Sequence, residues 1–211
     1  MNQNLEDIKK EIIHYGRMAE AKNLTPGVSG NMSARIGDRV IITSSGSANG
    51  YLAEDDFAII DLDGNIVEGT KKPSSEKLLH CEFYKLRPDI NYIIHVHSPY
   101  LSSFASAGIP LDEPIMAENV FYFGKIPLAE YGLPSSTDLV EKTSKYFKDY
   151  NAVLMANHGF IVGDKTIHDA FLKLTLAESY AQVVLNTKIL GGARVLSKEQ
   201  TEEILKLRQK L

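Results

Sequence analysis

The sequence predicts an α/β fold in which helices cover both faces of an antiparallel or mixed central sheet, a three-layer sandwich. Short apolar segments bounded by turn residues recur between residues 31 and 162, as expected of strands. Segments with apolar residues at helical spacing lie before, between and after them. No repeat, low-complexity tract or long linker divides the 211 residues, so we expect one domain over residues 1–211.

Helices are predicted where apolar residues recur every three or four positions behind a capping residue. They are residues 5–22 behind Asn4, residues 75–87 behind Ser74 or Ser75, the segment from Ser98-Pro99 to near Gly108, residues 136–149, a long helix opened by Thr166 with Asp169, and a short one opened by a Ser197–Gln200 capping box.

Strands are predicted for the short apolar runs, and Gly37-Asp38 and Asp63-Gly64 supply hairpin turns. The strands expected are residues 31–36, 39–43, 57–62, 66–68, 92–97, 125–129, 152–157 and 160–162.

Composition excludes several functional classes. A net charge of −4 without a long basic run argues against nucleic acid as a partner. No stretch reaches the roughly 18 apolar residues that a membrane span needs. The start, MNQNLEDIKK, lacks the basic and apolar regions of a secretion signal, and the single Cys81 calls for no oxidising compartment. We therefore expect a cytoplasmic globular protein, and composition says little more about its function.

Two histidines, His95 and His97, lie two positions apart in a predicted strand. Residues i and i+2 of a strand face the same side, so both imidazoles project together. This arrangement suits Zn²⁺, which takes nitrogen ligands at about 2.0–2.1 Å. The alternative is two polar side chains on a solvent-facing edge.

A third histidine, His158, follows another apolar strand, in Asn157-His158-Gly159. Three histidines with an open fourth position are typical of a catalytic zinc site, whereas a histidine alone in a turn could simply bond locally. His14 and His168 are expected on the surface, His80 in helix packing or beside Glu76, and Cys81 in the core.

Small polar residues mark three loops. Ser74-Ser75-Glu76 precedes a helix, where hydroxyl and backbone N–H groups bind phosphate or simply cap the helix. Beside a metal, Glu76 could move protons or act as a displaceable ligand. Ser29-Gly30-Asn31 and Thr43-Ser44-Ser45-Gly46 are ordinary turns or, with their accessible N–H groups, oxyanion-binding loops.

In chain order, the motifs G-N-M-S (30–33), T-S-S-G (43–46), S-S-E (74–76), H-V-H (95–97) and N-H-G (157–159) resemble the class II aldolase/adducin family, in particular its L-fuculose-1-phosphate aldolase branch. The resemblance runs from about residue 5 to residue 190. It implies a metal site of His95, His97, His158 and Glu76, with Glu76 also the catalytic acid/base. It implies a phosphate site of Asn31, Ser45, Gly46, Ser74 and Ser75.

The resemblance further implies Zn²⁺ (or Mn²⁺ or Co²⁺), a C4 homotetramer with active sites at subunit interfaces, and cleavage of a small ketose 1-phosphate. The expected products are dihydroxyacetone phosphate and a short aldehyde, formed through a metal-stabilised enediolate. The sugar is expected to be L-fuculose 1-phosphate-like or a 5-deoxypentulose 1-phosphate.

The sequence also departs from the fuculose branch. Pro114 to Met116 stand where that branch has a tyrosine, with Tyr122 and Tyr131 nearby, and the C-terminus lacks a tyrosine as well. Three alternatives therefore stay open. One is a pentulose-5-phosphate 4-epimerase, for which Asp112, Glu113 or Glu118 would supply the acid/base. The others are a methylthioribulose-1-phosphate dehydratase and a non-catalytic adducin-like domain.

Overall fold

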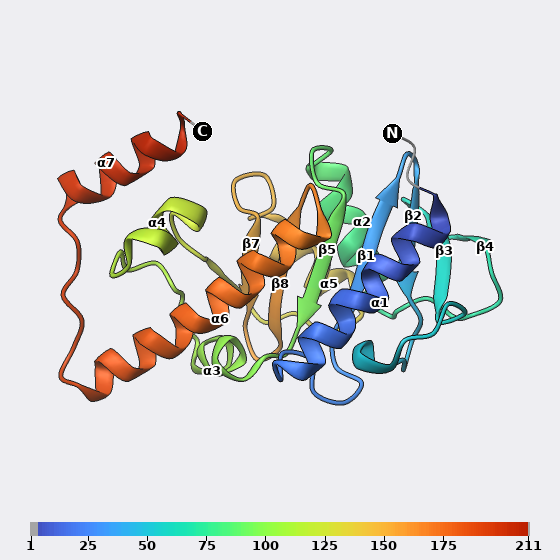
Figure 1. The fold of residues 1–211 in the computed structure, drawn as a ribbon, viewed down its shortest axis with the longest axis horizontal. Coiled ribbons are helices and arrows are strands. Elements are labelled where there is room, and N and C mark those ends of the chain that lie inside the picture. Colours follow the sequence, from blue (N-terminus) through green and yellow to red (C-terminus); the bar gives the residue numbers. More distant parts are fainter. Residues whose placement is uncertain (1–3, 211) are drawn as a thin grey trace.

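A single mixed sheet organises the fold in the computed structural model, which describes residues 4–210 (Figure 1). Residues 1–3 and 211, at the two ends of the predicted domain, lie outside this range. The strand order is β4-β3-β2-β1-β5-β8-β7-β6, and neighbours are antiparallel except β6 and β7, which are parallel. The strands are β1 (Asn31–Ile36), β2 (Arg39–Thr43), β3 (Phe57–Asp61), β4 (Ile66–Glu68), β5 (Tyr92–Val96), β6 (Leu128–Ala129), β7 (Ala152–Met155) and β8 (Gly159–Asp164).

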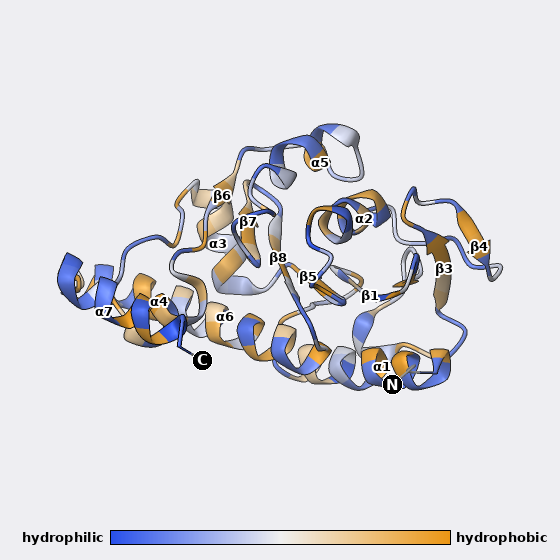
Figure 2. Ribbon diagram, turned by 90° about the horizontal axis from the view of Figure 1, so that it is seen from above, coloured by the Kyte–Doolittle hydropathy of each residue, from blue (hydrophilic) through white to orange (hydrophobic). Residues whose placement is uncertain are grey.

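Helices cover both faces of this sheet, as predicted. Figure 2 shows α1 and α6 along one face and α2 and α5 on the other, and α3 packs against α6 and β8. The helices are α1 (Leu5–Ala21), α2 (Lys77–Leu86), α3 (Pro99–Ala107), α4 (Ala117–Phe123), α5 (Thr137–Ser144), α6 (Ile167–Ile189) and α7 (Lys198–Arg208), with a 3₁₀ turn at Asn49–Tyr51.

The alternation of β5 divides its side chains between two apolar cores. Tyr92, Ile94 and Val96 belong to the core beneath α1, α3 and α6. Ile93 belongs to the core beneath α2 and α5. Because side chains two apart share a face, His95 points to the side of the sheet that carries α2.

Helix caps agree with the sequence in part. Ser136 and Thr166 accept backbone N–H groups at the starts of α5 and α6, and Ser197 and Gln200 form the predicted capping box of α7. For the first and third helices the predicted N-cap positions are confirmed but the side-chain capping bonds are absent, and for the second helix the predicted position is wrong. Asn4 and Ser98 occupy N-cap positions without accepting a backbone N–H, and Glu76, instead of Ser74 or Ser75, is the N-cap residue of α2.

Other boundaries differ modestly from the predictions. The strand expected over residues 125–129 is only Leu128–Ala129, and the helix expected over residues 136–149 ends at Ser144. Helix α4 was not predicted, because its seven residues begin without a side-chain cap and are held by contacts with α6 and α7. Within residues 4–210, no helix is long and apolar enough to span a membrane.

Candidate metal centre and active site

His95 is buried at the end of β5, opposite Asn31 of β1 and Ile161 of β8. Its Nδ1 donates to the Phe160 carbonyl oxygen at 2.9 Å. Because a carbonyl only accepts, Nδ1 carries the proton, and in the neutral ring Nε2 keeps a lone pair. His95 is therefore oriented to offer Nε2 to a metal.

His97 follows the last residue of β5, and His158 lies in the turn that joins β7 to β8. Asn157 adopts a left-handed φ of 54°, which lets the chain reverse just before His158. At Gly159 an added Cβ would lie 2.4 Å from the Val96 carbonyl oxygen and 2.8 Å from His97 Cδ2. Glycine is thus required here for the two strand ends to bring the histidines together.

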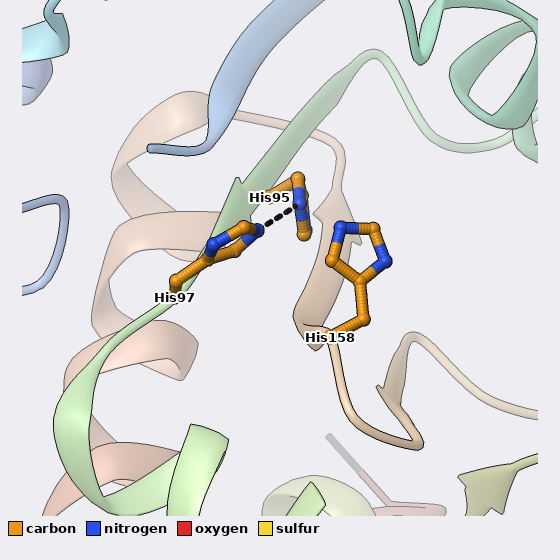
Figure 3. Close-up of side chains that lie close together, drawn as sticks. All are labelled: His95, His97 and His158. Carbon is orange, nitrogen blue, oxygen red and sulfur yellow. Dashed lines mark hydrogen bonds between the residues drawn. The ribbon is translucent and has the colours of Figure 1, made fainter. Parts of the chain in front are cut away.

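The three imidazoles converge (Figure 3). One ligand nitrogen from each of His95, His97 and His158 can be chosen so that all lie within 4.8 Å of one another. His97 Nε2 and His95 Nε2 are 2.9 Å apart. The ring centroids are 4.8–4.9 Å apart, with the ring planes steeply inclined.

Glu76 reaches this cluster from the residue before α2. Its Oε2 lies 3.0 Å from His95 Nε2, and its Oε1 lies 3.1 Å from His158 Nε2. Asn31 Nδ2 donates to Glu76 Oε2 at 3.0 Å. The structure thus brings Glu76 together with the three histidines and adds Asn31, expected only at a phosphate site, as its orienting partner.

The surroundings of Glu76 and His97 favour the protonation states in which these side chains can bind a metal. Burial raises the pKa of Glu76, but His95 and His158 outweigh it and hold that pKa well below its ordinary value. Burial, together with the neighbouring His95 and His158, lowers the pKa of His97 to about 3. Glu76 is therefore ionised and His97 neutral near pH 7.

This donor set fits a divalent cation. Three imidazoles and a carboxylate match the nitrogen and oxygen ligands of Zn²⁺. Two buried atoms, Glu76 Oε1 and His158 Nδ1, have no hydrogen-bond partner within the described chain. A cation contacting Glu76 would satisfy its orphaned oxygen. The His95, His97 and His158 group could hold a divalent metal.

A cavity of about 220 Å³ opens beside these side chains. Four of the five predicted phosphate-site residues line it: Asn31, Gly46, Ser74 and Ser75. Ser45 is exposed and does not line it, whereas its neighbours Ser44 and Ser47 do. Sequence reasoning also missed Val28, Pro134 and Ser135 in the wall; the positive φ of Ser135, 66°, has no signature in the sequence.

The remaining predicted residues lie elsewhere. His14 and His168 are exposed, and Cys81 is buried with its pKa raised by burial to about 11. Within the described chain no tyrosine lines the 220 Å³ cavity: Tyr122 borders a separate cavity between α4 and α6, and Tyr131 is about half exposed.

Fold and site together define the class of protein. Residues 10–185 match the model of the class II aldolase and adducin N-terminal domain, and the chain belongs to this family. An L-fuculose phosphate aldolase of Methanocaldococcus jannaschii is 37% identical over 84% of this chain and 95% of its own length. A 5-deoxy-D-ribulose 1-phosphate aldolase of Bacillus thuringiensis is 34% identical over 96% of this chain and 95% of its own.

A solved structure of an L-fuculose 1-phosphate aldolase superposes with a TM-score of 0.91 at 31% identity, covering 99% of both chains. The predicted family and α/β fold are thereby confirmed. Not every relative is an aldolase: a methylthioribulose-1-phosphate dehydratase of Methylococcus capsulatus is 32% identical over 76% of this chain and 84% of its own.

Proposed function

We propose that this protein is a zinc-dependent class II aldolase, which reversibly cleaves a small ketose 1-phosphate into dihydroxyacetone phosphate and a short aldehyde. The observation that carries the proposal is the buried Glu76 carboxylate, 3.0 Å from His95 and 3.1 Å from His158, beside a cavity lined by small polar loops. His95, His97, His158 and Glu76 would hold the ion, with Mn²⁺ or Co²⁺ as possible substitutes for Zn²⁺.

The ion, when bound, would supply Lewis-acid stabilisation of negative charge on the substrate oxygens. Aldol cleavage breaks the bond between the carbon beside the carbonyl and the next carbon. The hydroxyl on that second carbon passes its proton to the group that protonates the aldehyde oxygen in the synthetic direction, and the electrons of the broken bond pass into the enediolate of dihydroxyacetone phosphate. Glu76 returns a proton to the enediolate carbon, and in the synthetic direction it removes that proton.

Substrate phosphate is assigned to the loops around the cavity. Asn31, Gly46, Ser74 and Ser75 line it and offer hydroxyl, amide and backbone N–H donors, and Ser45 stands beside them. Donors of this kind suit a phosphate oxyanion. The relatives named for fuculose phosphate and for 5-deoxyribulose phosphate favour a sugar of five or six carbons.

A dehydratase is the second candidate, favoured by the methylthioribulose-phosphate dehydratase among the relatives. Elimination would use the same proton abstraction beside the carbonyl, but a neighbouring hydroxyl would leave as water while the carbon–carbon bond stays intact. The two reactions therefore differ in the bond that breaks, a carbon–carbon bond in the aldolase and a carbon–oxygen bond in the dehydratase.

The deciding experiment is solvent deuterium exchange into dihydroxyacetone phosphate, followed by NMR on protein of measured zinc content. An aldolase exchanges one hydrogen without any aldehyde, and Glu76→Gln should abolish this exchange. Glu82→Gln, on α2 away from the centre, serves as the matched control and should exchange normally. Absence of exchange in the zinc-loaded wild type would reject the aldolase and move the test to methylthioribulose 1-phosphate.

A further inference from the structure

Helix α6 sends one carboxylate to the start of α3. Glu178 accepts a hydrogen bond from the Ser98 hydroxyl at 2.7 Å, and from the backbone N–H groups of Tyr100 and Leu101 at 2.9 Å each. Ser98 is fully buried. Three donors of one helical turn thus bind the single Glu178 side chain, which is 77 or more positions away in sequence.

These contacts take the place of the ordinary helix cap. An N-cap serine normally accepts the N–H of the second or third helical residue, which here are Tyr100 and Leu101. Ser98 accepts neither, and its hydroxyl donates to Glu178 instead. Pro99, the first helical residue, has no N–H to satisfy. Glu178 therefore meets the hydrogen-bonding needs of this helix start from another helix.

The turn that Glu178 holds begins immediately after His97. Within residues 4–210, the one hydrogen bond of the His97 ring joins its Nε2 to His95 Nε2. A histidine that binds metal is ordinarily oriented by a bond from its other ring nitrogen, as His95 is by Phe160. His97 lacks that anchor, so its orientation must depend on the backbone on either side: β5 before it and the Ser98 turn after it.

We propose that Glu178 is a positioning residue for the metal centre, which fixes His97 through the Ser98–Leu101 turn and thereby strengthens binding of a divalent ion. The inference rests on the proposed metal site but not on the identity of the reaction. It also couples α6 to the centre, although no residue of α6 lines the 220 Å³ cavity.

Glu178→Gln tests this directly. The variant keeps the size of the side chain but replaces one accepting oxygen by an N–H₂ group that cannot accept the turn's N–H groups. Zinc affinity, measured by chelator competition, should fall by about 10-fold or more, the scale typical of lost ligand support. The visible absorption spectrum of the Co²⁺-substituted variant should change as well, because the ligand geometry changes.

Thr166→Ala is the matched control, because the Thr166 hydroxyl caps the start of α6 itself by accepting the Asp169 N–H. It should lower the free energy of unfolding and leave zinc affinity unchanged. If Glu178→Gln loses stability like the control but binds zinc within twofold of the wild type, Glu178 is a structural cap only and the proposal is wrong.

If Glu178→Gln does not fold, Ser98→Ala removes one of the three contacts more gently. It should weaken zinc binding by a smaller factor, and unchanged affinity would overturn the proposal. A wild type that binds no zinc would overturn the metal centre and this inference together. A wild type that binds zinc but neither exchanges nor cleaves would overturn only the aldolase assignment.

Discussion

At the scale of single residues, the candidate metal centre depends on one position without a side chain. A Cβ at residue 159 would come 2.4 Å from the Val96 carbonyl oxygen, a backbone atom that cannot move without shifting β5. We expect Gly159→Ala to cost about 1–3 kcal/mol of stability, the usual range for overpacking, and to weaken zinc binding because His97 is displaced. Chemical unfolding and chelator competition measure the two effects.

Gly163→Ala, on the same strand, is the control for this prediction. Its added Cβ would meet the Ile90 and Phe83 side chains at 2.9–3.3 Å, and these can adjust. It should lower stability without changing zinc affinity. Equal zinc affinities in the two variants would show that Gly159 serves packing alone.

Among the proposed metal ligands, His97 is expected mainly to retain the metal and Glu76 mainly to transfer protons. His97→Ala should lose both bound zinc and activity, because it removes one of three nitrogen donors. Glu76→Gln should retain most of the zinc, since three histidines remain, but lose proton transfer. Metal analysis of each purified variant beside its turnover rate separates these outcomes, and full turnover in Glu76→Gln would reject its assigned role.

At the scale of elements, α2 and β1 share a buried polar network next to the candidate metal ligands. Ser33 Oγ lies 2.7 Å from both His80 Nδ1 and the Tyr84 hydroxyl. Burial, with a smaller contribution from the nearby His95 and against the opposing effect of Glu76, lowers the pKa of His80 from its ordinary 6.5 to about 3. His80 is therefore neutral in the folded protein at every pH above that value.

This shift predicts how stability depends on pH. The unfolded chain takes up a proton at His80 near pH 6.5, whereas the folded chain resists it down to about 3. The contribution of His80 is thus complete above pH 6.5 and is lost as the pH falls through this window. Acidification from about pH 6.5 to 4.5 should remove about 2 kcal/mol through this group in the metal-free protein.

Urea unfolding at several pH values, with chelator present, checks the prediction. His80→Gln should flatten the pH dependence relative to wild type, because the titrating group is gone. Tyr84→Phe, which changes the other partner of Ser33 but removes no group that titrates in this range, should leave the pH dependence unaltered. Parallel curves for wild type and His80→Gln would contradict the prediction.

Local sequence patterns predicted most elements but not the contacts between them. The strands of β1 and β2 were predicted to the residue, because alternation and a Gly37-Asp38 turn act within a few positions. Helix α4 was not predicted, because packing against α7 stabilises it rather than caps of its own. For the same reason the sequence predicted Ser98 as the N-cap residue of α3 but not the bonds that cap this helix, which Glu178 accepts from 80 residues beyond Ser98.

In the candidate site too, local sequence patterns predicted some features, whereas contacts between distant segments could not be predicted. Strand periodicity alone predicted that His95 and His97 share a side, and a glycine turn indicated His158. The hydrogen bond from Asn31 to Glu76 depends on the register of β1 with β5, in which Asn31 stands opposite His95. Registers join distant segments, so no local pattern reports them.

At the scale of the whole molecule, several large side chains with apolar surface are exposed to solvent in the single chain. Ile189 and Leu190, at the end of α6, are 77% and 83% exposed, and Tyr122 and Tyr131 are about half exposed. We propose that the protein assembles as a C4 homotetramer in which Tyr122 or Tyr131 of a neighbouring subunit completes the site, as the proton donor that one chain does not provide. Light scattering measures the mass of the assembly.

Mixing subunits tests whether sites are shared. A Glu76→Gln protein and a Tyr122→Phe/Tyr131→Phe double variant should each be inactive as pure homotetramers. After subunit exchange at equal amounts, about a quarter of the sites would pair an intact Glu76 with an intact neighbouring tyrosine, as cyclic symmetry requires. Recovery of about that fraction of wild-type activity is the expected result. Mixed tetramers without activity would mean that each site is built from one chain, and an active tyrosine double variant would remove both tyrosines from the reaction.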